Sequence, residues 1–132
     1  MLWNRQKKSV LPTHIVGDIG EQLAADYLST QGLTLLDTKF HCRLGEIDLV
    51  MKDQSTIVFI EVKYRKNSLF GGAISAVSHK KQQKIIKTAL FYLQHRGLKE
   101  YNTPCRFDVV AILGNFNYPD ISWLKNAFTE TN

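Results

Sequence analysis

Hydrophobic residues along the chain fall into two helical patterns separated by extended ones. Apolar side chains recur at helical spacing from about Gly17 to Gln31, which predicts an amphipathic helix that stops at Gly32. A second helical pattern begins at Ser75 or Ser78 and continues to His95. Each helix has one apolar face, so each is expected to pack against a larger apolar surface.

Other segments have the composition of β-strands. The clearest runs from Thr56 to Tyr64 and is almost continuously β-branched or aromatic, which is typical of a strand buried on both faces. Three further strands are expected at residues 33–37, 46–51 and 106–113. The last apolar segment, from Ile121 to Phe128, predicts a short terminal helix. Its expected inward-facing residues are Trp123, Leu124 and Phe128.

These elements give the order α-β-β-β-α-β-α and indicate an α/β protein. A long helix between two strands implies a crossover to a parallel neighbour, whereas the short connections near residues 52–55 imply antiparallel pairing. The expected architecture is therefore a mixed central sheet flanked by helices.

Charged residues interrupt the apolar pattern where two neighbouring strands should meet. Glu61 and Lys63 are two residues apart, so they point to the same face of their strand. If the chain turns with two or four residues near Asp53-Gln54-Ser55, Asp48 pairs with Phe59 or Glu61 and lies on that face too. Two carboxylates and an ammonium at one point predict a divalent metal site with a lysine beside it. The alternative is a salt bridge from Lys63 to one carboxylate, which leaves the second acid unexplained.

Strict alternation along the preceding strand divides its residues between two faces. Ile47, Leu49 and Met51 share one face, and Glu46, Asp48 and Val50 share the other. Glu46 is then either a fourth acid or a strand-end partner for Arg43. Asp108 lies in the middle of its strand, beyond the acidic-x-Lys block, and is interpreted as structural.

Length and composition favour one folded domain with an anionic partner. The chain has 132 residues, of which 44% are hydrophobic, and a formal net charge of +5. Residues 1–12 are interpreted as a basic, loosely ordered arm and residues 13–132 as a single domain. The start lacks an apolar signal region, no stretch is long enough to span a membrane, and the two cysteines lack a CxxC spacing. A cytoplasmic protein with no membrane association is expected.

Basic residues near the proposed site are candidates for contact with phosphates. Arg65 and Lys66 directly follow the Glu61 strand, and a glycine-containing loop over residues 67–72 comes next. Lysines line one face of the second helix at helical spacing. The candidate nucleic-acid-binding residues are Arg43, Arg65, Lys66, Lys80, Lys81 and Lys84.

Four short motifs resemble those of the YraN family of uncharacterised bacterial proteins. They are Gly17-x-x-Gly20-Glu21, Gly45-Glu46-Ile47-Asp48-Leu49, Phe59-Ile60-Glu61-Val62-Lys63 and Arg106-Phe107-Asp108-Val109-Val110. The resemblance extends from about Gly17 to Phe128. That family in turn resembles the PD-(D/E)XK nucleases, which have the restriction-endonuclease-like fold, and especially the archaeal Holliday-junction resolvases.

The resemblance implies a role for each matching residue. Asp48 matches the metal-binding aspartate, Glu61 and Lys63 match the acidic-x-Lys strand, and Glu21 matches a helical acid that completes the site. Lys81 or Gln82 matches a polar position on the following helix. The chain departs from its relatives at Lys39-Phe40-His41, before the Asp48 strand, where they tend to have an asparagine and an arginine.

Two hypotheses of different classes follow. The first is a Mg²⁺- or Mn²⁺-dependent endonuclease that hydrolyses phosphodiester bonds, with DNA favoured over RNA and branched or damaged DNA as candidate substrates. Its catalytic residues would be Asp48, Glu61, Lys63 and Glu21, and its metal ligands Asp48, Glu61 and Glu21. Resolvase-like chemistry would also imply a homodimer. The second is a non-catalytic protein on a nuclease fold, which binds nucleic acid or recruits partners.

Overall fold

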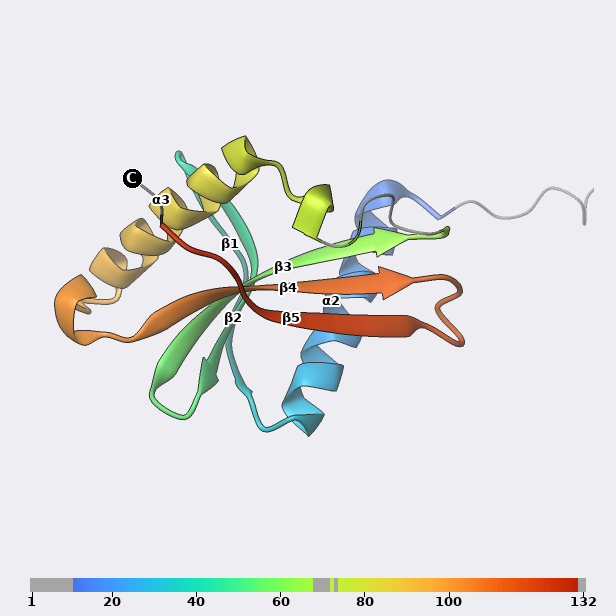
Figure 1. Cartoon of the computed structure of the whole chain (residues 1–132), viewed down its shortest axis with the longest axis horizontal. Helices are drawn as coiled ribbons and strands as arrows, with labels where there is room; N and C mark the ends of the chain where they lie inside the picture. The colour runs from blue at the N-terminus through green and yellow to red at the C-terminus, as the bar shows by residue number, and fades with distance from the viewer. Residues whose placement is uncertain (1–10, 68–71, 73, 131–132) are drawn as a thin grey trace, which may run out of the picture.

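A five-stranded sheet lies between two helices in the computed structural model, which describes residues 11–67, 72 and 74–130 (Figure 1). The elements in chain order are α2 (Thr13–Thr30), β1 (Thr34–Cys42), β2 (Gly45–Asp53), β3 (Thr56–Arg65), η1 (Ile74–Ala76), α3 (His79–His95), η2 (Glu100–Asn102), β4 (Cys105–Leu113) and β5 (Asp120–Phe128). Residues 1–10 of the expected arm and residues 68–71 of the expected loop lie outside the described residues.

The sheet is mixed, as the sequence predicts. Its strand order is β1-β2-β3-β4-β5; β3 and β4 are parallel, and every other neighbouring pair is antiparallel. Helix α3 lies in the connection between β3 and β4, which confirms the expected crossover to a parallel neighbour. Within the described part of the chain, no helix combines the length and apolarity needed to cross a membrane.

Each face of the sheet carries its own apolar cluster. On one face, Ile85, Ala89 and Leu93 of α3 pack against buried residues of the strands. On the other, Ala24, Ala25 and Leu28 of α2 do the same. The sheet is thus buried on both sides, which explains why β3 is apolar at nearly every position.

Small residues bring α2 close to the sheet. Gly20 is buried, and a β-carbon placed there would meet the side chains of Tyr64, Ile112 and Val62 at 3.8–4.0 Å. Ala24 follows one turn later and is fully buried. This close approach fixes the position of Glu21, the residue after Gly20.

The segment predicted as a terminal helix is instead strand β5. It pairs antiparallel with β4, with a register shift opposite Phe107 and Val109. Trp123 packs on the α2 side and Leu124 on the α3 side, so both faces of the strand carry apolar residues. A strand covered on both faces lacks the two-residue alternation of apolar and polar side chains, and this explains why the β5 segment was predicted as a helix.

Asp108 has the structural surroundings expected of it. Its side chain is fully buried and accepts hydrogen bonds from Arg106 Nε at 3.1 Å, Trp123 Nε1 at 2.9 Å and the backbone N–H of Asn126 at 2.8 Å. Asn126 has a φ of 52°, in the left-handed region. The carboxylate therefore fixes the irregular part of β5 against β4.

The first two strands depart from the sequence prediction in extent and in facing. Strand β1 continues to Cys42, beyond the predicted end at Asp37, and so includes Lys39. The sequence pattern did not indicate this length, because a mostly exposed edge strand lacks a regular alternation of apolar and polar residues. Ile47 joins the α3-side cluster, whereas Leu49 and Met51 join the α2-side cluster, so the prediction that all three share a face is wrong. The change of facing occurs between Ile47 and Leu49, which pair with Phe40 and Thr38 of β1. Lys39 lies between those two partners and has a φ of 50°, which makes β1 irregular at this point.

A glycine at the start of β2 lies directly against α3. A β-carbon at Gly45 would lie 2.8 Å from Thr88 Oγ1, and φ at Gly45 is 156°. Thr88 is fully buried, and its hydroxyl donates to the Lys84 carbonyl oxygen. The start of the strand that carries Asp48 is therefore in tight contact with α3.

We expect Gly45→Ala to destabilise the fold by about 1–3 kcal/mol, because overpacking at a buried contact forces a backbone shift. Gly17→Ala in α2 is the matched control, since no atom of the described residues lies within 4 Å of a β-carbon there. Alanine is the better helix former, so that change should stabilise by about 0.5–1 kcal/mol. Urea unfolding of both variants measures the difference, and equal stability of the two would contradict the close contact.

Candidate metal and nucleic-acid site

Asp48 and Glu61 come together because of the register between β2 and β3. Leu49 pairs with Ile60, and Asp53 pairs with Thr56 across a turn of two residues. Asp48 and Glu61 are the residues that directly adjoin the last of these pairs, Leu49 and Ile60. The two-residue turn is the even loop on which the sequence prediction depended.

Asp48 is placed where the regular pairing of β2 with β3 ends. Its Oδ2 accepts a hydrogen bond of 2.8 Å from the backbone N–H of Val62, so the carboxylate takes the place of a strand carbonyl. Among the described residues, no lysine, arginine or histidine forms an ion pair with it. Burial and the negative charge of Glu61 raise the pKa of Asp48 to about 7, and the Val62 N–H only partly opposes this rise.

Glu61 is buried but has two cations nearby. Only 5% of the residue is exposed. Its Oε2 lies 3.6 Å from Lys63 Nζ and 3.9 Å from Lys81 Nζ. Both distances exceed the 2.7–2.9 Å of a charge-assisted hydrogen bond, so the two lysines act on Glu61 mainly through their charge. The approach of Lys81 from α3 also shows which of Lys81 and Gln82 reaches the site.

Glu21 reaches the same region from α2. Its carboxylate accepts a hydrogen bond of 2.7 Å from Lys39 Nζ, which is also 2.6 Å from Asp18 Oδ1. Burial raises the pKa of Glu21; the hydrogen bond to Lys39 lowers it, and the charge of Asp48 raises it. The three predicted acids therefore form a chain of electrostatic contacts from Glu21 through Asp48 to Glu61.

An open cavity of about 260 Å³ contains all of these acids. Its lining from α2 includes Gly17, Gly20 and Glu21, and its lining from the sheet includes Asp48 and the end of β3 from Glu61 to Arg65. The acids are therefore accessible to a ligand, although Glu61 itself is nearly covered.

The donor chemistry of this cavity suits a hard divalent cation held partly by water. Carboxylate oxygens are the ligands that Mg²⁺ prefers, and this ion usually keeps several waters and needs only one or two protein carboxylates. Within the described residues, no three histidine, cysteine, aspartate or glutamate side chains converge closely enough to hold an ion. Lys39 instead pairs with Glu21, and Lys63 and Lys81 lie beside Glu61. The arrangement fits an ion bound by Asp48 and Glu61 rather than a closed three-acid cage.

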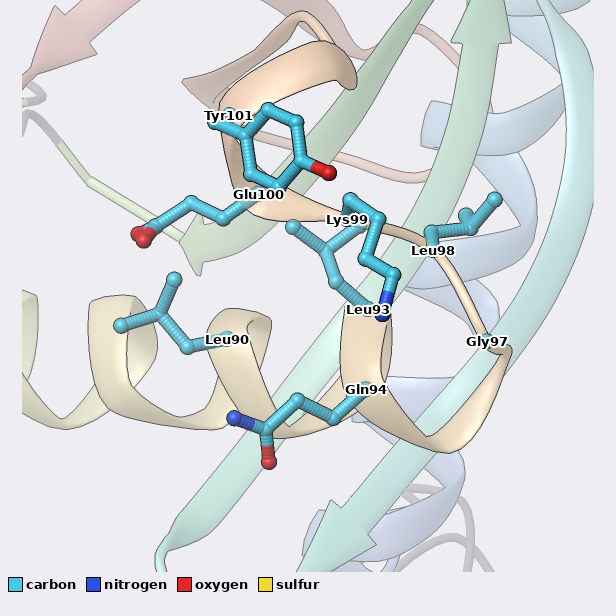
Figure 2. A pocket seen from close by; sticks show the side chains of 8 residues that line it. All are labelled: Leu90, Leu93, Gln94, Gly97, Leu98, Lys99, Glu100 and Tyr101. Atoms are coloured by element: carbon cyan, nitrogen blue, oxygen red, sulfur yellow. The ribbon is translucent and has the colours of Figure 1, made fainter.

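A separate, larger cavity lies where α3 ends and η2 begins (Figure 2). Its volume is about 420 Å³, and its lining includes Leu90, Leu98 and Tyr101. It contains one acid, Glu100, and none of the predicted site residues. Cavity size therefore does not locate the acidic site.

Comparison with known proteins assigns the chain to a family. Residues 20–112 match the model of the uncharacterised protein family UPF0102. The chain belongs to UPF0102. This is the YraN family that the sequence motifs indicated. The chain is similar to a UPF0102 protein of Colwellia psychrerythraea, with 53% identity over 97% of this chain and 100% of that protein. A UPF0102 protein of Nitrosococcus oceani is 48% identical over 85% of this chain and 90% of its own length.

The predicted phosphate-binding residues of the UPF0102 chain lie in two places. Arg65 and Lys66 are exposed at the end of β3, beside the acidic cavity. Arg43 is exposed in the turn between β1 and β2, and Lys80 and Lys84 are exposed on α3. Of the lysines predicted on α3, only Lys81 forms an ion pair with a site acid among the described residues.

Sequence reasoning missed the role of Lys39 in this UPF0102 site. The residue belongs to the Lys39-Phe40-His41 segment, which departs from the family pattern. In the structure, its ammonium joins Asp18 and Glu21, and these contacts raise the pKa of Lys39. The left-handed φ of Lys39 could not be predicted, because neither a glycine nor an asparagine stands at this position.

The raised pKa of Asp48 makes a prediction about stability and pH. A carboxyl group whose pKa is higher in the folded state favours folding below its unfolded pKa near 4, and that stability is lost as the pH rises to about 7. Above pH 7 without metal, Asp48→Asn should therefore be more stable than the wild type, by on the order of 1–4 kcal/mol. The asparagine can still accept from Val62 N–H.

Urea unfolding at pH 5 and pH 8 in the presence of EDTA measures this difference. Asp120→Asn, an exposed acid at the start of β5, is the control and should follow the wild type at both pH values. A loss of several kcal/mol in Asp48→Asn at pH 8 would show instead that Asp48 is a stabilising partner in a buried ion pair.

Proposed function

We propose that this UPF0102 chain is a metal-dependent endonuclease that hydrolyses phosphodiester bonds in DNA, on a fold of the restriction-endonuclease-like type. The observation that carries the proposal is the location of Asp48 and Glu61 side by side, with Lys63 at the same point, in an open cavity. The order of the acidic-x-Lys strand after the Asp48 strand and the mixed sheet support the same assignment.

The cost of the site supports a catalytic function. The sheet holds two carboxyl groups together, and burial together with the negative charge of Glu61 raises the pKa of Asp48 to about 7. Such a pair lowers stability unless a cation or a proton neutralises it. Strongly perturbed carboxyl groups in an accessible cavity are typical of functional sites. A protein that only binds phosphates has no need for acids in that position.

Asp48 and Glu61 would hold the ion, and Glu21 would contribute through water. A bound Mg²⁺ or Mn²⁺ would polarise the scissile phosphate and lower the pKa of a coordinated water. The residues of the chain then have separate tasks. Lys63, whose ammonium is partly exposed beside Glu61, would donate to the phosphate oxygen on which charge develops. Arg65 and Lys66, exposed at the end of the same strand, would contact the neighbouring phosphates.

Metal binding is the first test of this proposal. We expect Mn²⁺ or Mg²⁺ to stabilise the wild type by about 2.7 kcal/mol at a hundredfold excess over Kd, because the ion binds only the folded state. Asp48→Asn should lose most of this shift. The affinity should also increase as the pH rises through about 7, since the ion competes with the proton on Asp48. Thermal unfolding with each metal and with EDTA measures both effects. An equal shift in the wild type and in Asp48→Asn would remove Asp48 from the site.

Cleavage is the second test. The purified protein should cut members of a panel of duplex, flap, single-stranded and four-way DNA substrates only when Mg²⁺ or Mn²⁺ is present. Lys63→Ala should lower the rate by on the order of 10²–10³, because the loss of one donor oriented toward the developing charge costs that much. Its DNA binding should change little, because the slope of log K against log salt concentration should decrease by about one unit at most.

Lys52→Ala is the matched control, since Lys52 is exposed on β2 at the end away from Asp48. It should cut at the wild-type rate. If the wild type binds DNA with normal salt dependence but cuts no substrate with either metal, the nuclease proposal fails. The binding function on a nuclease fold then replaces it.

A further inference from the structure

A second hollow lies next to the acidic cavity, at the carboxyl ends of β3 and β4. It has a volume of about 600 Å³, within the range of small-molecule sites. Its lining residues are Leu11, Tyr64, Lys66, Asn67, Gly114, Asn115, Phe116 and Asn117. Tyr64 lines both this hollow and the acidic cavity, so the two are adjacent.

An aromatic pair forms part of the wall of this hollow. The rings of Tyr64 and Phe116 are 4.4 Å apart between centroids and are inclined by 32°. Both residues are partly exposed rather than buried in the core. Aromatic rings at an open surface provide a flat apolar face on which a planar ring can stack.

Hydrogen bonds hold this aromatic pair and its loop in place. The Tyr64 hydroxyl donates to the Gly114 carbonyl oxygen at 2.7 Å, and the Gly114 N–H donates to the Arg65 carbonyl oxygen at 2.9 Å. Asn115 accepts from the backbone N–H of Asn117 at 2.7 Å. The loop after β4 is therefore fixed to the end of β3. The rings of Phe116 and Tyr64 consequently need little further ordering when a ligand binds.

The charge and polarity of the lining select the kind of ligand. Among the described residues, the lining contains one cation, Lys66, three asparagine amides and no acid. Arg65 lines the adjoining acidic cavity. A ligand that combines a flat polar ring with a neighbouring negative charge matches this surface. A nucleotide within a strand has both features.

We propose that the hollow binds an unpaired base of the nucleic-acid strand that crosses the acidic cavity. The base stacks on Phe116 and Tyr64, and Lys66 contacts the phosphate beside it. Stacking on a side-chain ring requires a base that is not already stacked in a duplex, so the substrate class is single-stranded or splayed nucleic acid next to the cut. This inference rests on the proposed nuclease function, because it places the scissile phosphate one cavity away.

Binding without cleavage tests the inference directly. A single-stranded oligonucleotide that contains 2-aminopurine is titrated with the full chain in EDTA, beside a blunt duplex of the same length. Phe116→Ala should weaken single-strand binding by about five- to 150-fold and leave the salt dependence unchanged, because stacking is worth about 1–3 kcal/mol per base. The quenching of 2-aminopurine on binding should also decrease. Duplex binding should change little.

Four further variants separate stacking from other effects. Phe116→Leu keeps an apolar side chain but lacks an aromatic face, so it should still weaken binding, whereas Phe116→Trp should retain it. Tyr118→Ala is the matched control, since Tyr118 is a neighbouring aromatic residue, 87% exposed, that does not line the hollow. It should bind like the wild type. Lys66→Ala should reduce the salt slope for a single strand by about 0.7.

The outcomes for this hollow and for the acidic cavity are distinct. If Phe116→Leu and Tyr118→Ala bind the single strand equally well while the wild type cuts DNA, the base-binding inference is wrong and the nuclease proposal stands. If binding depends on Phe116 but no substrate is cut with either metal, the hollow stands and the nuclease proposal fails. Equal weakening of single-strand and duplex binding by Phe116→Leu would also overturn the inference.

Discussion

Repulsion between the neighbouring carboxyl groups of Asp48 and Glu61 is the constraint around which the rest of the site is organised. The sheet forces the two groups together, because their strands are buried on both faces and cannot separate without exposing the core. Neutralisation comes from outside the pair: the Val62 N–H at Asp48 and the ammonium groups of Lys63 and Lys81 near Glu61. A bound cation would neutralise the two carboxylates more fully than Lys63 and Lys81 do, since the lysine ammonium groups lie 3.6 and 3.9 Å from Glu61.

Both helical layers contribute to this one end of the sheet. The small residues on α2 allow that helix to lie close to β3 and β4, and Glu21 is thereby brought within electrostatic reach of Asp48. On the opposite face, the contact between Gly45 and Thr88 fixes the start of β2 against α3, the helix that carries Lys81. The acids are therefore positioned by packing in the core, and only the lysines that surround them depend on long, adjustable side chains.

Much of the fold and the central pair of acids could be predicted from the sequence. Strand β3 and the proximity of Asp48 to Glu61 follow from composition and from the two-residue turn between β2 and β3. The terminal strand could not be predicted, because Trp123 and Leu124 pack on opposite faces and conceal the alternation. The facing of Ile47 and the role of Lys39 depend on a local backbone irregularity that no glycine or proline announces. The resemblance to the YraN family was correct, and it included Lys63 and, as one of two alternatives, Lys81, but it assigned no role to Lys39.

The two outermost strands of the sheet are both irregular. Strand β1 has a register shift between Leu35 and Asp37 and a left-handed residue at Lys39, while β5 has a left-handed residue at Asn126, opposite a register shift in β4. Irregular edges of this kind discourage the addition of another strand, which is how many proteins avoid uncontrolled association through open sheet edges. A second copy of the chain, or any extended peptide, would therefore find little template for continuing the sheet. Association would have to use helices or the ends of strands, and the unpaired edges can stay in water without nucleating aggregates.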